Sequence, residues 1–135
     1  MQGYNVIWVF SPTAGKVLFC KRHKEPYKGL YNLVGGKIEP GEDGLIAAYR
    51  ELREETCITD IELVHVMGFT YFQRDACRVE VYFGRLTADT EVSGDEKELV
   101  WLDVCEDFFD MNRFAGEGNI GHIHEIIKQN LDRVR

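Results

Sequence analysis

Three carboxylates lie close together in the sequence, at Glu51, Glu54 and Glu55. Their spacing of i, i+3 and i+4 places them on one side of a helix, within an arc of roughly 100°. If they converge to within about 5 Å, each pair repels by roughly 3 kcal/mol at an effective dielectric of 20, a cost that a bound cation reverses. Solvated helix faces carry the same pattern, with the side chains extended into water. As a metal site, an all-oxygen cluster favours Mg²⁺ or Mn²⁺ over zinc.

The helix that must carry this cluster is predicted over residues 43–56, with Asp43 as its N-cap. Arg50 and Arg53 flank the carboxylates, where they can orient them through charge-assisted hydrogen bonds. An adjacent apolar face is formed by Leu45, Ala48, Tyr49 and Leu52. One helix is therefore expected to serve both the core and the site.

The remaining elements are mostly strands. Runs rich in β-branched and aromatic residues cover 4–10, 16–21, 30–34, 61–72, 77–86 and 99–102. Turn residues after the first run and at 73–76 predict two hairpins. Apolar residues at helical spacing over 120–134 predict a final amphipathic helix. Strands mixed with two main helices predict an α/β sandwich around a central sheet, with residues 1–135 forming a single domain.

Composition excludes several classes of function. The net charge of -7 and the sequence pI near 5.1 argue against binding to a nucleic acid polymer. The amino terminus has no basic region, and its apolar run at 6–10 is too short for a signal peptide or a membrane span. We therefore expect a cytoplasmic protein without a membrane partner.

Cysteine and histidine spacing gives no second metal site. The four cysteines are scattered, so we interpret them as reduced, mostly buried thiols. His122 and His124 stand at i, i+2 and diverge on a helix, which argues against a shared ion.

The setting of the acidic cluster resembles the signature of the Nudix hydrolases, G-x5-E-x7-R-E-U-x-E-E-x-G-U, in which U is a bulky aliphatic residue. One fixed position differs, because Cys57 stands where the family has Gly. Cysteine there would be disfavoured by roughly 1 kcal/mol, since the helix ends at a residue that readily adopts the left-handed conformation. The matching residues in this Nudix box, 36–58, are Gly36, Glu42, Arg50, Glu51, Leu52, Glu54, Glu55 and Ile58.

The resemblance implies a Nudix-type α/β/α sandwich with a mixed central sheet. It also implies hydrolysis of a nucleoside diphosphate linked to another moiety, with metal ions bridging the pyrophosphate oxygens and an activated water attacking phosphorus. By position, Arg50 would orient the carboxylates, and Glu42 would support them. Glu51 is also a candidate general base. The metal ligands implied by the resemblance are Glu51, Glu54, Glu55, the Gly35 carbonyl and, by spacing in the loop before Trp101, Glu96.

Substrate contacts are predicted from the stretch 30–37, which resembles MutT-type members and supplies Tyr31, Asn32, Gly36 and Lys37. Asn119 falls roughly where MutT-type members read the base. Phe114 or Tyr31 could stack on a purine, and Arg22 could hold a phosphate. The alternatives are a helix cap for Asn119, a core position for Tyr31 and a turn contact for Arg22.

Taken together, these residues favour a Mg²⁺-dependent (d)NTP pyrophosphohydrolase of MutT type, acting on oxidised purine nucleotides and releasing a nucleoside monophosphate and pyrophosphate. The alternatives are a nucleotide-sugar or dinucleotide pyrophosphatase, and an RNA-cap hydrolase, which the acidic balance disfavours. A non-catalytic Nudix-fold nucleotide sensor is a further alternative, although it would be expected to have lost carboxylates that this chain retains. The partner is a small nucleotide, and a homodimer is left open.

Overall fold

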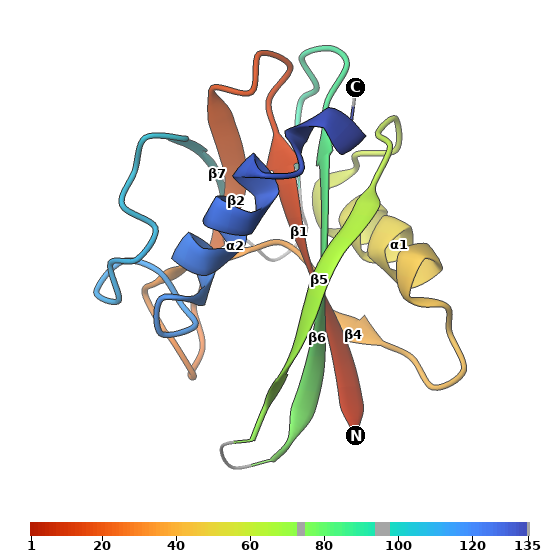
Figure 1. Ribbon diagram of the computed structural model, residues 1–135, viewed down its shortest axis with the longest axis vertical. Helices are drawn as coiled ribbons and strands as arrows, with labels where there is room; N and C mark the ends of the chain where they lie inside the picture. The colour runs from red at the N-terminus through yellow and green to blue at the C-terminus, as the bar shows by residue number, and fades with distance from the viewer. Residues whose placement is uncertain (73–74, 94–97, 135) are drawn as a thin grey trace.

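The structure, a computed structural model, describes residues 1–72, 75–93 and 98–134 (Figure 1). Its elements follow the predicted order, with a short additional strand before the first helix. They are β1 (Gln2–Phe10), β2 (Lys16–Lys21), β3 (Tyr31–Leu33), β4 (Lys37–Ile38), α1 (Gly44–Thr56), β5 (Val64–Tyr71), β6 (Cys77–Arg85), β7 (Glu98–Asp103), α2 (Asn119–Lys128) and the 3-10 turn η1 (Leu131–Arg133). None of the described helices is long and apolar enough to cross a membrane.

The sheet is mixed, and its main path runs in the order β3-β2-β1-β6-β5. The two predicted hairpins are present, because β1 pairs antiparallel with β2 and β5 pairs antiparallel with β6. The long central pair, β1 and β6, is parallel and keeps one register from Gln2↔Cys77 to Phe10↔Arg85. β4 also pairs with β1, and β7 pairs with β2. β4 therefore brings the start of the Nudix box to the central strand.

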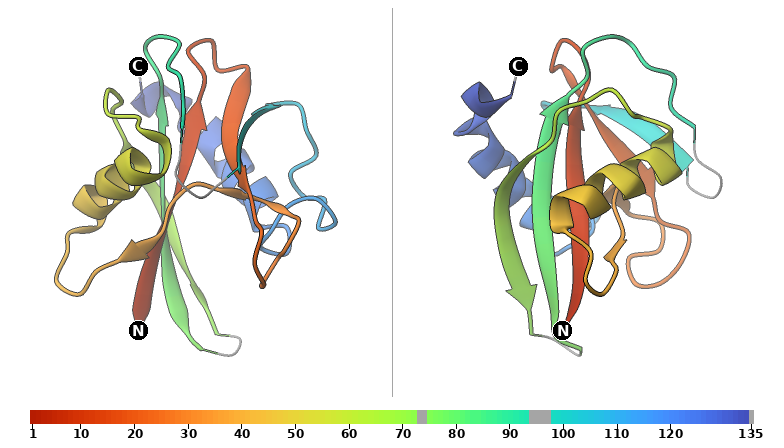
Figure 2. Two further views of the ribbon diagram at one scale, coloured as in Figure 1. Left: turned by 180° about the vertical axis from the view of Figure 1, so that it is seen from behind. Right: turned by 90° about the vertical axis from the view of Figure 1, so that its right-hand side faces the viewer.

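Two hydrophobic cores lie on opposite faces of this sheet, because side chains alternate along a strand. In β1, Ile7 and Val9 belong to the core beneath α1, whereas Trp8 and Phe10 belong to the core beneath α2. The right-hand view of Figure 2 shows the sheet between the two helices. The expected α/β/α sandwich is thus confirmed.

Helix α1 begins and ends as the sequence predicts. Asp43 caps its first turn by accepting hydrogen bonds from the N–H groups of Leu45 and Ile46, both at 3.1 Å. At the other end Cys57 is left-handed, with φ 66° and ψ 9°, and its N–H donates to the Arg53 carbonyl at 2.9 Å. Cysteine therefore adopts the conformation that the family's Gly supplies. The strain expected at this position is present, and the helix still stops there.

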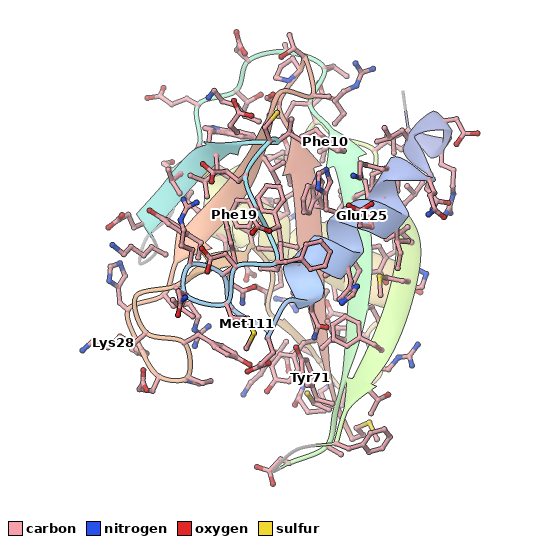
Figure 3. All side chains as sticks on the ribbon, turned by 60° about the vertical axis from the view of Figure 1, so that its left-hand side comes forward. Phe10, Phe19, Lys28, Tyr71, Met111 and Glu125 are labelled. Carbon is pink, nitrogen blue, oxygen red and sulfur yellow. The ribbon has the colours of Figure 1, made fainter. Side chains whose placement is uncertain are left out.

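The core beneath α2 is largely aromatic. Trp8, Phe19, Phe108 and Phe114 pack with ring centroids 5.1–6.3 Å apart, and Figure 3 labels Phe10 and Phe19 on this side of the sheet. His124 stacks on Trp8 at 5.0 Å, while His122 meets Phe109 instead. The two histidines therefore have different partners, as their spacing predicts.

Two predictions about elements and one about the cysteines need correction. The final helix ends at Lys128 rather than at 134, because a 3-10 turn follows that leaves Leu131 45% exposed and brings Val134 against the core. The strand predicted over 61–72 covers only Val64–Tyr71, because Ile61 and Leu63 pack beneath α1 from a connecting segment. All four cysteines are free, but Cys57 and Cys105 are exposed, so the thiols are not mostly buried.

Candidate active site

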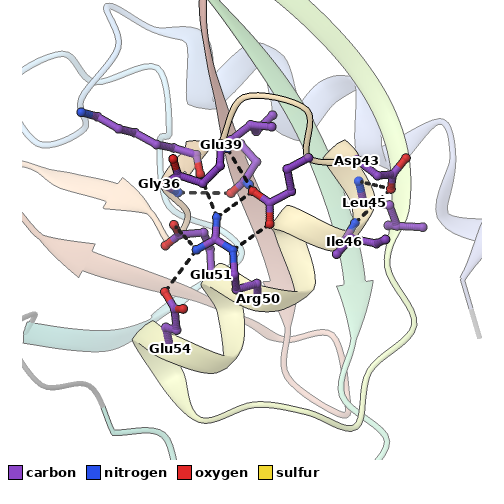
Figure 4. A network of polar contacts seen from close by, with 12 residues as sticks. Gly36, Glu39, Asp43, Leu45, Ile46, Arg50, Glu51 and Glu54 are labelled. Atoms are coloured by element: carbon purple, nitrogen blue, oxygen red, sulfur yellow. Dashed lines mark hydrogen bonds and ion pairs between the residues drawn. The ribbon is translucent and has the colours of Figure 1, made fainter.

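Arg50 is the centre of the polar network on α1 (Figure 4). Its Nε and Nη2 donate to the two carboxylate oxygens of Glu42 at 2.8 and 2.9 Å. Its Nη1 donates to Glu51 at 3.0 Å and to Glu54 at 3.3 Å. Nη2 also reaches the Lys37 carbonyl at 3.1 Å. One guanidinium thus organises three of the predicted carboxylates and joins the helix to β4.

Glu42 is held more firmly than an ordinary surface carboxylate. Besides Arg50, it accepts a hydrogen bond from the N–H of Glu39 at 3.0 Å, which closes the turn before the helix. Arg50, followed by this backbone bond, lowers the pKa of Glu42 from 4.5 to about 2. Glu42 therefore stays ionised near neutral pH and fixes the orientation of Arg50.

Glu51 lies directly against Gly36. A Cβ atom at Gly36 would come within 2.6 Å of the Glu51 carboxylate, so a residue with a side chain there would force the end of Glu51 to move. The Glu51 side chain is only 13% exposed. Burial, and next the negative charge of Glu55, raise the pKa of Glu51, while Arg50 opposes that rise. This carboxylate is therefore placed where a nearby positive charge would stabilise its ionised form.

Gly35 connects the same segment to Glu55. Its N–H donates to Glu55 Oε2 at 3.1 Å. Its φ of +145° is one that residues with a side chain rarely adopt, and a Cβ there would lie 2.2 Å from the Asn5 carbonyl oxygen. Glycine at 35 is thus required both by the backbone and by the neighbouring strand. The predicted metal ligands on α1 and the Gly35 segment are brought together.

The donor set fits a divalent metal, although the side chains are not arranged around one point. Within residues 1–72, 75–93 and 98–134, no three His, Cys, Asp or Glu side chains converge as ligands of an ion would. Glu51 and Glu54 instead turn to Arg50, and Glu55 to the Gly35 N–H. Glu54 is 55% exposed, and it contacts Arg50 through the 3.3 Å hydrogen bond. The oxygen-only donors suit a hard cation, while Glu96 lies outside the described residues.

The predicted substrate residues are placed less uniformly. Tyr31 is half-buried and pairs with Phe114 through a parallel bridge. Phe114 itself is 1% exposed and packed among Phe19 and Phe108, so it has no open ring face for a purine, and the predicted stacking role is corrected. Arg22 donates from Nε to the Pro26 carbonyl at 2.7 Å, which fits the turn-contact alternative.

Asn119 does not cap α2, because the N-cap is Gly118 and makes no side-chain bond. It is the first helical residue, and its Nδ2 donates to the Tyr71 hydroxyl at 2.5 Å. The cap alternative for Asn119 is therefore wrong.

The other two predicted substrate residues lie on β3 and β4. Asn32 accepts a local hydrogen bond from the Leu33 N–H at 2.9 Å, and the Lys37 side chain is exposed.

Sequence reasoning missed a clamp beside Asn119. The Tyr27 hydroxyl donates to the Glu117 carboxylate, with its oxygens at 2.6 and 2.8 Å, and thereby ties the loop after β2 to the turn before α2. Both residues have positive φ, 69° for Tyr27 and 54° for Glu117. Burial and Glu117 raise the pKa of Tyr27 above its ordinary value. Because the two residues are 90 positions apart, no local signal could have paired them.

Comparison with known proteins agrees with this geometry. The NUDIX domain family matches residues 1–122, so the chain belongs to the Nudix family. An RNA pyrophosphohydrolase of Pelagibacter ubique (strain HTCC1062) is 40% identical over 47 residues. That match covers 35% of this chain and only 30% of the relative.

Solved structures share the fold over nearly the whole chain. The C. elegans Ap4A hydrolase has a TM-score of 0.77 and 18% identity, with 98% of each chain covered. MutT, studied from Aliivibrio salmonicida and Vibrio cholerae, has a TM-score of 0.70 and 25% identity, covering 95% of this chain and 98% of that one. The NUDIX domain of Shewanella oneidensis NrtR, complexed with ADP ribose, has a TM-score of 0.74 and 17% identity over 96% and 87%.

Proposed function

We propose that this chain is a Mg²⁺-dependent pyrophosphohydrolase that cleaves the pyrophosphate bond of a nucleoside diphosphate derivative. The observation that carries the proposal is the Arg50 network, which holds Glu42, Glu51 and Glu54 together beside the Gly35–Gly36 segment. A chain that kept only the fold would not need three partly shielded carboxylates on one guanidinium, because each repels the others. The preferred substrate class is a (d)NTP, giving a nucleoside monophosphate and pyrophosphate.

In this proposal the residues of α1 and the Gly35 segment have two roles, metal binding and proton transfer. Glu51, Glu54, Glu55 and the Gly35 carbonyl would hold Mg²⁺, or Mn²⁺ in its place, with Glu96 as a further candidate. A bound ion would neutralise phosphate charge and lower the pKa of a water molecule. Hydrolysis adds that water across the phosphoanhydride bond, and Glu51 is the proposed acceptor of its proton.

The substrate end is proposed around Asn119 and Tyr31. The Asn119 amide and the Tyr71 hydroxyl form a polar pair that suits the edge of an oxidised purine. Arg22 and Lys37 supply positive charge for phosphate oxygens, and Asn32 lies on β3, which stands between them in the sequence. The Tyr27–Glu117 clamp holds the loop that carries Arg22.

Hydrolysis of a nucleotide panel tests the proposal. The panel contains (d)NTPs and their oxidised purine forms, ADP ribose, a dinucleoside polyphosphate, a nucleotide sugar and 5′-triphosphate RNA, with Mg²⁺ present or chelated. We expect Glu54→Gln to lower kcat/KM by at least about 100-fold, since it removes a ligand charge. Glu125→Gln, on the exposed face of α2, is the matched control and should be unchanged. Turnover that ignores Glu54→Gln or chelation would refute the metal site, and tight binding without turnover would favour a sensor.

A further inference from the structure

Asn5 is an unusual residue for its position in the central strand. It is 1% exposed, and the other buried polar residue among those described is Thr56. Side chains two apart on a strand share a face, so Asn5 lies on the same side of β1 as Ile7 and Val9, which belong to the core beneath α1. An amide therefore stands where this strand otherwise places aliphatic side chains.

The contacts of Asn5 are with the two glycines that precede the Nudix box helix. Its Oδ1 accepts from the Gly36 N–H at 3.1 Å, and its own N–H donates to the Gly36 carbonyl at 2.9 Å. Its carbonyl oxygen would lie 2.2 Å from a Cβ at Gly35. Both the backbone and the side chain of Asn5 thus fix the path of these glycines.

The same glycines meet the proposed metal ligands on their other side. The Gly35 N–H donates to Glu55 at 3.1 Å, and the Glu51 carboxylate occupies the space where a Gly36 side chain would be. Asn5 is therefore linked to both carboxylates through one intervening backbone segment. A shift of that segment would move Glu51, Glu55 and the Gly35 carbonyl relative to one another.

Stability alone does not account for this amide. The hydrogen bond from Gly36 identifies Oδ1 as the oxygen, and the buried Nδ2 has no hydrogen-bond partner among the described residues. A buried donor without an acceptor destabilises the folded state, whereas an aliphatic residue would not. Of the two polar side-chain atoms of Asn5, the one with a partner is Oδ1, and that partner is the Gly36 N–H.

We propose that Asn5 is a positioning residue for the metal site, which sets the Gly35–Gly36 segment against Glu51 and Glu55 through its Oδ1 bond to Gly36. This inference rests on the proposed function, because it presumes that these groups bind a divalent ion. It adds a residue outside the Nudix box, on the first strand of the chain, to the machinery of the site.

Calorimetric titration with Mn²⁺ alone tests this role without relying on turnover. We expect Asn5→Ala to weaken Mn²⁺ binding by roughly tenfold, since the ligand-bearing segment loses its anchor while every ligand remains. Asn5→Ser, which withdraws the acceptor from Gly36 but keeps a polar group, should show the same loss and serves if Asn5→Ala does not fold. The matched control is Thr56→Val, because Thr56 is the other buried polar residue and bonds the Leu52 carbonyl rather than Gly36.

Thermal unfolding without metal separates positioning from general destabilisation. Asn5→Ala and Thr56→Val are both expected to lower Tm, but only the Asn5 variants should lose Mn²⁺ affinity. Equal Mn²⁺ affinity in Asn5→Ala, Asn5→Ser and Thr56→Val would overturn the role of Asn5. If the unaltered chain neither binds Mn²⁺ nor hydrolyses the panel, the proposed function fails as well. If it does both, only the assignment to Asn5 is at stake.

Discussion

At the scale of single residues, Cys57 shows how a site helix is ended by an unfavourable residue. Its φ of 66° lies in the left-handed region, which costs a residue with a Cβ roughly 1–2 kcal/mol and costs Gly almost nothing. The neighbouring residues Thr56 and Ile58 are buried, at 0% and 2% exposure. Because packing on both sides fixes the chain, the cap geometry persists despite the strain.

Replacement of Cys57 by Gly should therefore stabilise the protein. We expect Cys57→Gly to raise the free energy of unfolding by about 1 kcal/mol, after part of the gain is lost to the greater freedom of Gly in the unfolded chain. Urea denaturation measures the change. Cys105→Gly is the control, because Cys105 is also exposed but has no positive φ, and it should bring no gain. Equal effects of the two changes would contradict the cap argument.

At the scale of elements, α1 is fixed to the turn that precedes it at two points. Asp43 caps the first helical turn, and Arg50, nearly two turns further on, reaches back to Glu42 with two nitrogens. Glu42 in turn holds the Glu39 N–H. The turn and the helix therefore move as one unit, which keeps the Arg50 guanidinium aimed at Glu51 and Glu54.

The contribution of Glu42 to stability should fall as the pH is lowered. The pKa of Glu42 is about 2 in the folded protein, below its ordinary 4.5, so its contribution to stability is full above about pH 5 and is lost as pH falls from 4.5 to 2. Glu42→Gln should be less stable than the unaltered chain at pH 7, and the difference should shrink toward pH 2. Urea unfolding at several pH values checks this. In an Arg50→Met background the pH-dependent difference should shrink to the smaller part that the Glu39 N–H contributes, and an undiminished difference would show that Arg50 is not its main cause.

At the scale of the whole molecule, the site lies beside β1, the strand that contributes side chains to both hydrophobic cores. Helix α1 buries Ala48 and Leu52 against β1, the same strand that carries Trp8 into the core beneath α2. The Gly35–Gly36 segment is hydrogen-bonded to that strand at Asn5. A ligand that ties α1 to this segment therefore resists separation of the helix from the whole sheet.

Metal binding should consequently stabilise the entire fold. At Mg²⁺ about 100 times its Kd, the free energy of unfolding should rise by about 2.7 kcal/mol, provided that the unfolded chain binds little metal. Thermal melts with increasing Mg²⁺ measure the shift in Tm. Glu54→Gln should reduce it strongly, and NaCl at matched ionic strength should not reproduce it. A shift of equal size in Glu54→Gln would assign the stabilisation to ions bound elsewhere.

The helix of the site, its Asp43 cap, its stop at Cys57 and the positions of most strands along the chain could be predicted from the sequence. These features depend on residues a few positions apart, so the spacing of side chains along the chain already encodes them. The resemblance to the Nudix signature belongs to the same category, because it lies within residues 36–58. The end of α2 differs from the prediction for a related reason. The apolar spacing continues past Lys128, but Leu131 is 45% exposed, and Val134 meets the core from beyond a 3-10 turn.

Only the tertiary structure decided which distant residues share the site. Asn5 and Gly36 are 31 positions apart, and Tyr27 and Glu117 are 90 apart, so neither pair leaves a pattern in any short window. Phe114 could have been a stacking surface by its type, but the bridge from Tyr31 places it in the core. The sequence by itself determined the chemistry of the acidic helix. Strand pairing decided what lies against that helix, because pairing joins residues through space regardless of their separation along the chain.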